Sequence, residues 1–140
     1  MVFHVGSLLR LNEARLLPQL KRISSVSGGS ITAGVLGLAW NKLDFQAGTN
    51  DSGIARNLRE LLLPPIRRMA SETIDRQSIL GGILIPGLSI SDFIVNEYKK
   101  LLFDDATLQD LPADGAGPRF VINATNCLLY TSDAADEGLG

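Results

Sequence analysis

The chain has 140 residues, of which 45% are hydrophobic and 20% charged, and its formal net charge is −2 at pH 7. This composition predicts one folded domain, not a disordered chain, with no basic surface for nucleic acid. A single cysteine excludes an internal disulfide or a cysteine-based metal cluster, and no apolar run is long enough to predict a membrane span. We expect neither a metal nor a cofactor.

The start of the chain predicts a helix followed by a strand. Apolar residues at helical spacing predict an amphipathic helix over residues 2–14. Charged side chains at Arg10 and Arg15 fall where a secretory signal peptide would be apolar, so none is predicted and the cellular location stays open. Pro18 then leads into a short β-branched segment that ends at Ser27.

A buried helix is predicted directly after Ser27. The stretch GGSITAGVLGLAW, residues 28–40, is apolar or small on every side, and a helix that is apolar all round is a buried one. Gly34 and Gly37 lower the intrinsic stability of a helix. We therefore expect neighbouring backbones to approach closely at these two positions.

The rest of the chain predicts further helices and a second strand. In chain order the patterns indicate a loop over 43–53, a helix over 54–74 interrupted at Pro64-Pro65, an amphipathic helix over 89–103, a loop over 104–118 and a strand over 119–126. Ser89 or Ser91 is the expected N-cap of the amphipathic helix. The alternation of helices and strands predicts an α/β fold.

The turn between the first strand and the buried helix carries the main functional hypothesis. A strand, a small-x-Ser-x-Gly sequence and a helix form a nucleophile elbow, which holds a serine hydroxyl clear of the sheet. Here Ser27 is the candidate nucleophile, and the Gly28 amide is a candidate oxyanion donor at the positive end of the helix. Ser25, Val26 and Gly29 complete the elbow. Small residues are expected because the strand and helix backbones nearly touch, although Ser25 stands where the usual pattern has glycine.

Two non-catalytic roles of this turn stay open. In the first, Ser27 or Ser30 only caps the helix. In the second, the glycine-rich helix start binds a phosphate group, although the segment lacks the Gly-Lys-Ser/Thr ending of a P-loop. Either role would make the protein a binding module.

A family resemblance adds to this pattern. Residues 3–40, FHVGSLLRLNEARLLPQLKRISSVSGGSITAGVLGLAW, with the later ATLQDLP and RFVINATN, resemble the N-terminal part of a patatin-like phospholipase domain. The resemblance covers residues 1–126 and implies a three-layer α/β/α sandwich with a mainly parallel sheet. It implies a hydrolase of phospholipids or other lipid acyl esters that uses a Ser-Asp dyad, with Ser27 as nucleophile, and that touches lipid surfaces transiently. No histidine is required, and His4 precedes the serine, unlike the histidine of an α/β-hydrolase triad.

The resemblance also places the dyad aspartate in an Asp-Gly-Gly or Asp-Gly-Ala motif after the serine. Asp114-Gly115-Ala116 matches this motif and makes Asp114 a candidate base. It precedes the second strand, so if the two strands are parallel it lies at the opposite sheet edge from Ser27, and a surface turn is the preferred interpretation. We expect the family's glycine-rich oxyanion loop and its aspartate to lie outside this sequence, and the 140-residue chain to be inactive.

The end of the chain has a different origin from the rest. CLLYTSDAADE, residues 127–137, is residue for residue the translation of one reading frame of a transposase-end adapter used in sequencing libraries. We therefore interpret residues 127–140 as a non-native, disordered tail and residues 1–126 as a partial domain. An ordinary acidic tail is the alternative. Cys127 receives no functional role.

Overall fold

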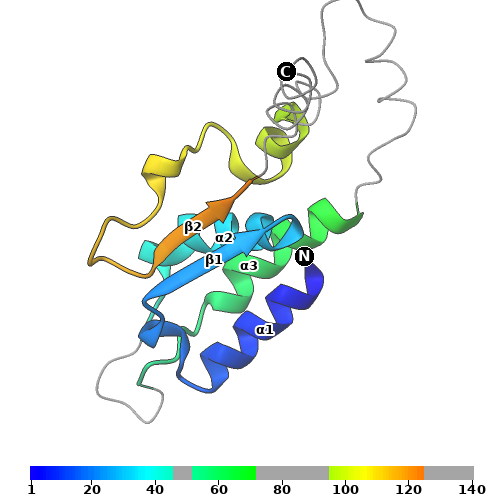
Figure 1. The fold of residues 1–140 in the computed structure, drawn as a ribbon. Helices are drawn as coiled ribbons and strands as arrows, with labels where there is room; N and C mark the ends of the chain where they lie inside the picture. Colours follow the sequence, from blue (N-terminus) through cyan, green and yellow to red (C-terminus); the bar gives the residue numbers. More distant parts are fainter. Residues whose placement is uncertain (46–51, 72–94, 125–140) are drawn as a thin grey trace, which may run out of the picture.

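The computed structural model describes residues 1–45, 52–71 and 95–124 (Figure 1). Its main elements are α1 (Val2–Glu13), β1 (Arg22–Val26), α2 (Gly28–Ala39), α3 (Leu58–Ser71) and β2 (Arg119–Asn123). Three 3-10 turns and a π-helical turn connect them, at Leu17–Gln19, Trp40–Lys42, Leu108–Asp110 and Lys99–Phe103. The fold is mixed α/β, which confirms the predicted class.

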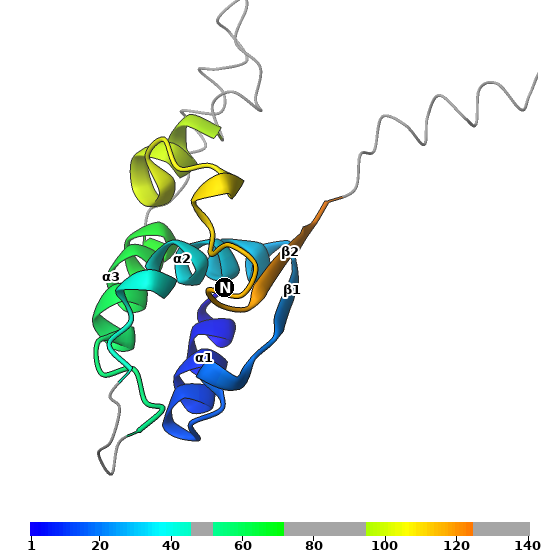
Figure 2. The same ribbon diagram turned by 90° about the vertical axis from the view of Figure 1, so that its left-hand side faces the viewer.

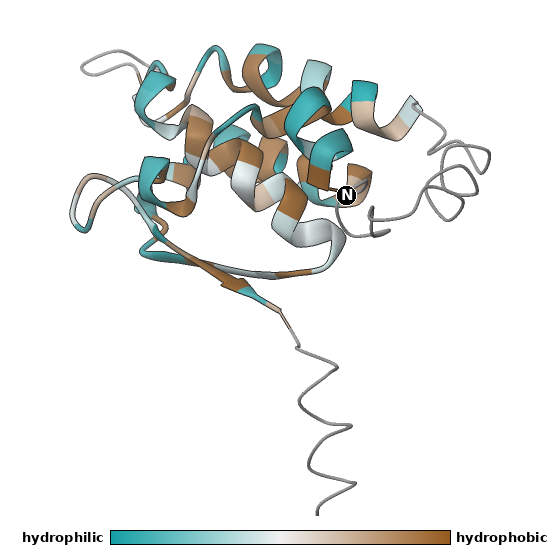
Figure 3. Ribbon diagram, turned by 90° about the horizontal axis from the view of Figure 1, so that it is seen from above, coloured by the Kyte–Doolittle hydropathy of each residue, from teal (hydrophilic) through white to brown (hydrophobic). Residues whose placement is uncertain are grey.

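The two strands form a parallel sheet in which both strands end at the same edge. Arg22 pairs with Arg119 at one end, and Val26 pairs with Asn123 at the other. The helices α1, α2 and α3 lie on one side of this sheet (Figures 2 and 3). Along β1, exposed residues alternate with half-buried ones, as expected for a strand with one covered face. Ile23 is half-buried and packs against the core.

The predicted buried helix is confirmed, and α2 lies between the sheet and α3 (Figure 2). Glycine occupies two positions of α2 for a different reason from the predicted one. A Cβ at Gly37 would lie 2.5 Å from Leu111 Cδ2, and one at Gly34 would lie 3.1 Å from the Phe103 ring. The two glycines therefore make room for large side chains, where we had expected neighbouring backbones.

The predicted break at Pro64-Pro65 is wrong, because α3 runs through both prolines. Pro64 is exposed and Pro65 is half-buried, while the opposite face of the helix is buried. Its buried side chains are those of Leu58, Leu62, Ile66 and Met69. The prolines remove two backbone donors, which costs the helix stability, but burial of this apolar stripe holds the helix together. Residues 54–57, predicted as helix, precede it as turn and bridge.

A buried asparagine fastens α1 to the chain segment before α3. Asn12 is 6% exposed, its Nδ2 donates to the Ala55 carbonyl at 2.9 Å, and its Oδ1 accepts from the Ala55 N–H at 2.8 Å. Ala55 also forms an antiparallel bridge with Phe45. The side-chain amide thus completes both backbone hydrogen bonds of a residue that water does not reach.

The helix predicted over 89–103 is described only from residue 95. Residues 95–98 are α-helical and continue into the π-helical turn, while Ser89 and Ser91 lie outside the described residues. The predicted loop over 104–118 contains a 3-10 turn, closed by a capping box between Thr107 and Asp110. The tail over 127–140 also lies outside the described residues. No helix in the described ranges is long and apolar enough to cross a membrane.

Candidate active site

Ser27 is the single residue between β1 and α2, and its backbone is strained. Its φ is 51° and its ψ is −132°, a left-handed conformation that residues with a side chain rarely adopt. Such a conformation costs about 1–3 kcal/mol and persists only where the surrounding structure enforces it. Ser27 is also exposed. The turn therefore has the backbone strain and the accessible hydroxyl that a nucleophile elbow requires.

Neither serine of the capping alternative caps α2. The Ser27 side chain makes no capping hydrogen bond, although Ser27 occupies the N-cap position. The Ser30 hydroxyl oxygen is buried and has no hydrogen-bond partner within the described residues. An N-cap serine normally bonds one of the free amides in the first helical turn. The geometry therefore does not favour a capping role for this turn.

The start of α2 offers a free donor next to Ser27. The first amides of a helix have no partner within the helix. Within the described ranges, no residue accepts a hydrogen bond from the Gly28 N–H group. This amide lies at the positive end of a twelve-residue helix. It can therefore donate to an oxygen that gains negative charge beside Ser27.

The start of the chain gives Gly28, but not Gly29, a steric reason to be small. A Cβ at Gly28 would lie 3.2 Å from the Met1 nitrogen, and one at Gly29 would lie 3.6 Å from His4 Nε2. Thr32 Oγ1 also lies 3.3 Å from the Met1 carbonyl oxygen, to which it donates. The tight contact at Gly28 is thus with Met1, before α1, whereas the prediction assigned the small size of both glycines to the approach of the strand and helix backbones.

A hollow of about 620 Å³ opens beside the Ser27 side chain. It is lined by Val26, Ser27, Gly28, Ser30, Ile31, Tyr98, Ile122, Asn123 and Ala124. No aspartate, glutamate, histidine, lysine or arginine stands among these lining residues. The described part of the chain therefore supplies a serine hydroxyl and an amide donor at this hollow, but no carboxylate or imidazole base.

Asn123 holds the two strand ends together beside the hollow. Its Nδ2 donates to Ser24 Oγ at 3.0 Å and to the Ser25 carbonyl at 3.1 Å. Ser25 is half-buried, and its Oγ lies 3.5 Å from the Val121 carbonyl oxygen. These bonds fix the last residues of β1 against β2, directly before the strained turn.

Asp114 lies at the other edge of the sheet from Ser27. Because the strands are parallel and in register, the segment before Arg119 lies beside the start of β1. The Asp114 carboxylate accepts from Arg119 Nη2 at 2.7 Å and from Nε at 3.2 Å. These hydrogen bonds, and then the positive charge of Arg119, lower the pKa of Asp114. The structure does not bring this candidate base to the candidate nucleophile.

His4 is exposed on α1 and also lies outside the Ser27 hollow. Its ring makes an edge-on contact with Phe3, with centroids 5.8 Å apart. It lines a separate hollow of about 240 Å³ with Ser24 and Ser25. No group of three or more potential metal-ligating side chains occurs in the described ranges.

Sequence reasoning did not assign five residues of the hollow to the site: Ser30, Ile31, Tyr98, Ile122 and Ala124. Ser30 lies three residues after Ser27, and helical periodicity alone places it on the same side of α2. Tyr98 and Ile122 are far from Ser27 in sequence, and no local pattern links them to it.

Comparisons with protein-family models, curated proteins and solved structures found no match to this chain.

Proposed function

We propose that this chain is part of a serine acyl hydrolase of the patatin-like type, with Ser27 as its nucleophile. The observation that carries the proposal is the exposed, strained Ser27, whose hydroxyl is not used as a helix cap. Strain of this kind is concentrated at functional sites because a relaxed turn would otherwise be more stable. The substrate class is a lipid acyl ester.

The proposed reaction follows from the groups around the turn. The Ser27 hydroxyl oxygen attacks the ester carbonyl carbon and its proton passes to a base, because a neutral serine is a weak nucleophile. The negative charge that forms on the carbonyl oxygen accepts a hydrogen bond from the Gly28 amide. Loss of the alcohol leaves an acyl-serine, which water then hydrolyses with help from the same base.

The base must come from elsewhere, because the hollow contains no titratable carboxylate or imidazole in its described lining. In the proposed dyad this base is an aspartate outside residues 1–140, in keeping with the family resemblance. Asp114 remains in its ion pair. We expect residues 1–140 alone to hydrolyse no ester, because removing a general base typically slows a reaction by about 10²–10⁴-fold.

The proposal includes a larger sheet than the described one. Parallel strands are nearly always covered on both faces, whereas the helices of the described residues cover one. We propose that further strands and a second helical layer complete a three-layer α/β/α sandwich in the full-length protein. Val26, directly before the Ser27 turn, is 64% exposed, and Phe3 on α1 is 81% exposed. Their exposed apolar side chains favour transient contact with a lipid surface.

A fluorophosphonate probe tests the proposal, because it labels only activated serines. We expect the full-length protein that carries this segment to be labelled, the Ser27→Ala variant to lose the label, and the Ser7→Ala variant to keep it. Ser7 is a matched control because it is exposed on α1 and bonds only within its own helix. A folded full-length protein without labelling would refute the hydrolase proposal and favour anion binding at the α2 start. That alternative lacks a cation, since no Lys or Arg lines the hollow in the described residues.

A further inference from the structure

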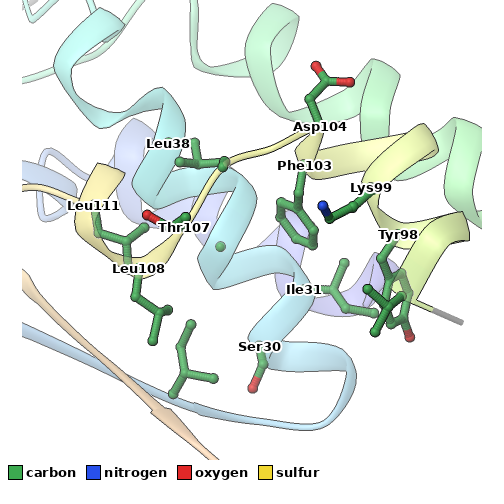
Figure 4. Close-up of a pocket in the computed structure, with 14 residues that line it drawn as sticks. Ser30, Ile31, Leu38, Tyr98, Lys99, Phe103, Asp104, Thr107, Leu108 and Leu111 are labelled. Atoms are coloured by element: carbon green, nitrogen blue, oxygen red, sulfur yellow. The ribbon is translucent and has the colours of Figure 1, made fainter. Parts of the chain in front are cut away.

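A second, apolar pocket lies beside the Ser27 hollow, between α2 and the segment 95–111 (Figure 4). Its volume is about 430 Å³. Most of its wall is hydrocarbon, contributed chiefly by Ile31, Leu38, Phe103, Leu108, Leu111 and Ile122. Figure 4 shows Ser30 and Ile31 at one end of the pocket and Leu38 at the other. A concave, mainly apolar site of this size is typical of small-molecule binding.

Several apolar side chains around this pocket are exposed. Leu108 is 71% exposed, Val95 is 51% exposed and Ile122 is 38% exposed, and all three line it. Water contact with such side chains is unfavourable, by about 25 cal/mol for each Å² of apolar surface. An apolar ligand that covered these side chains would therefore gain binding free energy.

The pocket and the Ser27 hollow share part of their walls. Four residues line both: Ser30, Ile31, Tyr98 and Ile122. Among them, Ser30 has a buried hydroxyl oxygen with no partner in the described residues, while its backbone N–H bonds the Ser27 carbonyl at 2.8 Å. A buried hydroxyl without a partner is unfavourable unless a ligand supplies one. The wall shared by the two cavities, their junction, thus combines a hydroxyl that has no partner in the described residues with apolar side chains.

We propose that the acyl chain of the ester attacked by Ser27 lies in this pocket, and that the Ser30 hydroxyl bonds an ester oxygen at the junction. This inference rests on the proposed function for the ester, but the apolar pocket can be tested without catalysis. A methylene group is about as large as a water molecule, which takes about 30 Å³, so the pocket holds a chain of about 10–14 carbons.

The first test measures binding to the full-length Ser27→Ala protein, which cannot turn over an ester. Saturated fatty acids of 8 to 16 carbons displace a fluorescent fatty acid, dansyl-undecanoic acid. We expect the affinity to rise about fourfold for each added methylene and to level off at about 14 carbons. Affinity that did not change with chain length would overturn the inference.

The second test substitutes the wall of the pocket. Leu108→Asp places a charge on the wall and should weaken binding of a 12-carbon acid at least tenfold. Leu16→Asp is the matched control, because Leu16 is also an exposed leucine, at 44%, but lies after α1 and does not line the pocket. Circular dichroism checks that both variants fold. Equal affinities of the two variants would contradict the proposal.

The junction residue Ser30 has its own expected effect. Ser30→Ala removes the polar atom but keeps the apolar wall, so binding of the fatty acid should weaken by about threefold to tenfold with the chain-length dependence unchanged. The hydrolase and the pocket can fail separately. Chain-length dependent binding without fluorophosphonate labelling would leave a lipid-binding pocket and refute hydrolysis. Labelling without chain-length dependence would refute the pocket alone.

Discussion

The two edges of the small sheet differ in how their polar groups are used. At the edge where β1 begins, Asp114 and Arg119 bond each other through two hydrogen bonds. At the edge where β1 ends, the Ser27 hydroxyl makes no capping bond, and the Ser30 hydroxyl is buried without a partner within the described residues. At the first edge, where β1 begins, these polar groups bond each other. At the second edge, where β1 ends, the backbone is strained and hydroxyl groups are left without these bonds.

This difference separates a structural turn from the turn that we propose to be functional. A turn that only joins two elements is most stable when its polar groups bond each other and its backbone is relaxed. Gly115 at the first edge has a φ of 88°, which glycine adopts without strain, whereas Ser27 has a φ of 51°. The Asp-Gly-Ala motif is therefore a closed structural turn, although its letters match a catalytic pattern. The Ser27 turn retains an energetic cost, for which the proposed role of its hydroxyl accounts.

The largest expected effect is on catalysis. If it were absent, the two edges of the sheet would not differ in function as we propose. In the full-length protein, Ser27→Ala should lower kcat for a lipid ester by about 10⁴-fold or more, as loss of a serine nucleophile does elsewhere. Asp114→Asn should change kcat less than twofold, because its carboxylate lies at the other edge. Ester hydrolysis followed by fatty-acid release measures both. A large loss of kcat in Asp114→Asn would show that the first edge is functional too.

The next effect concerns stability. It tests whether a side chain that hydrogen-bonds the backbone contributes more to the free energy of unfolding when it is buried than when water has access to it. Asn12→Ala leaves the buried Ala55 N–H without a partner and leaves its C=O group only the longer bond from the Leu58 N–H, at 3.4 Å. It should lower the free energy of unfolding by about 2 kcal/mol. Asn57 is a matched control, since it bonds the Asp44 N–H at 2.9 Å and the Lys42 carbonyl at 2.8 Å where water has access. Asn57→Ala should lower the free energy by about 1 kcal/mol. Urea unfolding measures both, and equal losses would contradict the argument from burial.

A smaller effect of opposite sign tests the strain at Ser27. Ser27→Gly should raise the free energy of unfolding by about 1 kcal/mol, because glycine adopts a positive φ without strain and loses only part of that gain in unfolded-state entropy. Ser27→Ala should not stabilise the protein, since alanine keeps the strained side-chain geometry. Asp104→Gly, at a φ of 47°, is a control for strain in another turn. A glycine variant no more stable than the alanine variant would argue against stored strain.

The smallest effect is electrostatic and concerns the first edge. Hydrogen bonds from Arg119, and then its charge, lower the pKa of Asp114, so the folded state favours the ionised carboxylate. The associated stability is present above the unfolded-state pKa and is lost as the pH falls through the lower folded-state pKa. An NMR titration should show Asp114 titrating below an ordinary aspartate, and Arg119→Met should return it to the ordinary range. Because the pair is exposed, Asp114→Asn should barely change stability at pH 7.

Local patterns predicted the elements but not the pocket. The helix periodicity of 2–14, the strand before Ser27 and the buried helix after it all match α1, β1 and α2. The prolines of α3 misled the prediction because tertiary burial outweighed a local preference, which the residues around the prolines do not reveal. The partners of Gly34 and Gly37 were missed for a related reason. They are side chains more than sixty residues further along, brought in by the fold.

The same reasoning explains the partial prediction of the site. Ser27, Gly28 and their neighbours form one short segment, so a sequence motif suffices to find them. The wall contributed by Tyr98 and Ile122 forms only when β2 pairs with β1, and pairing across that distance follows from the whole fold.

The left-handed turn at Ser27 also has an evolutionary consequence. Since glycine relieves the local penalty, random substitution without selection would replace this serine readily, and a protein near its stability threshold would tolerate the change. Descendants that keep the serine must therefore experience selection for its oxygen, while lineages that have abandoned the chemistry should drift to glycine. The identity of this one residue would then distinguish members of a lineage that are catalytically active from members that have lost the activity.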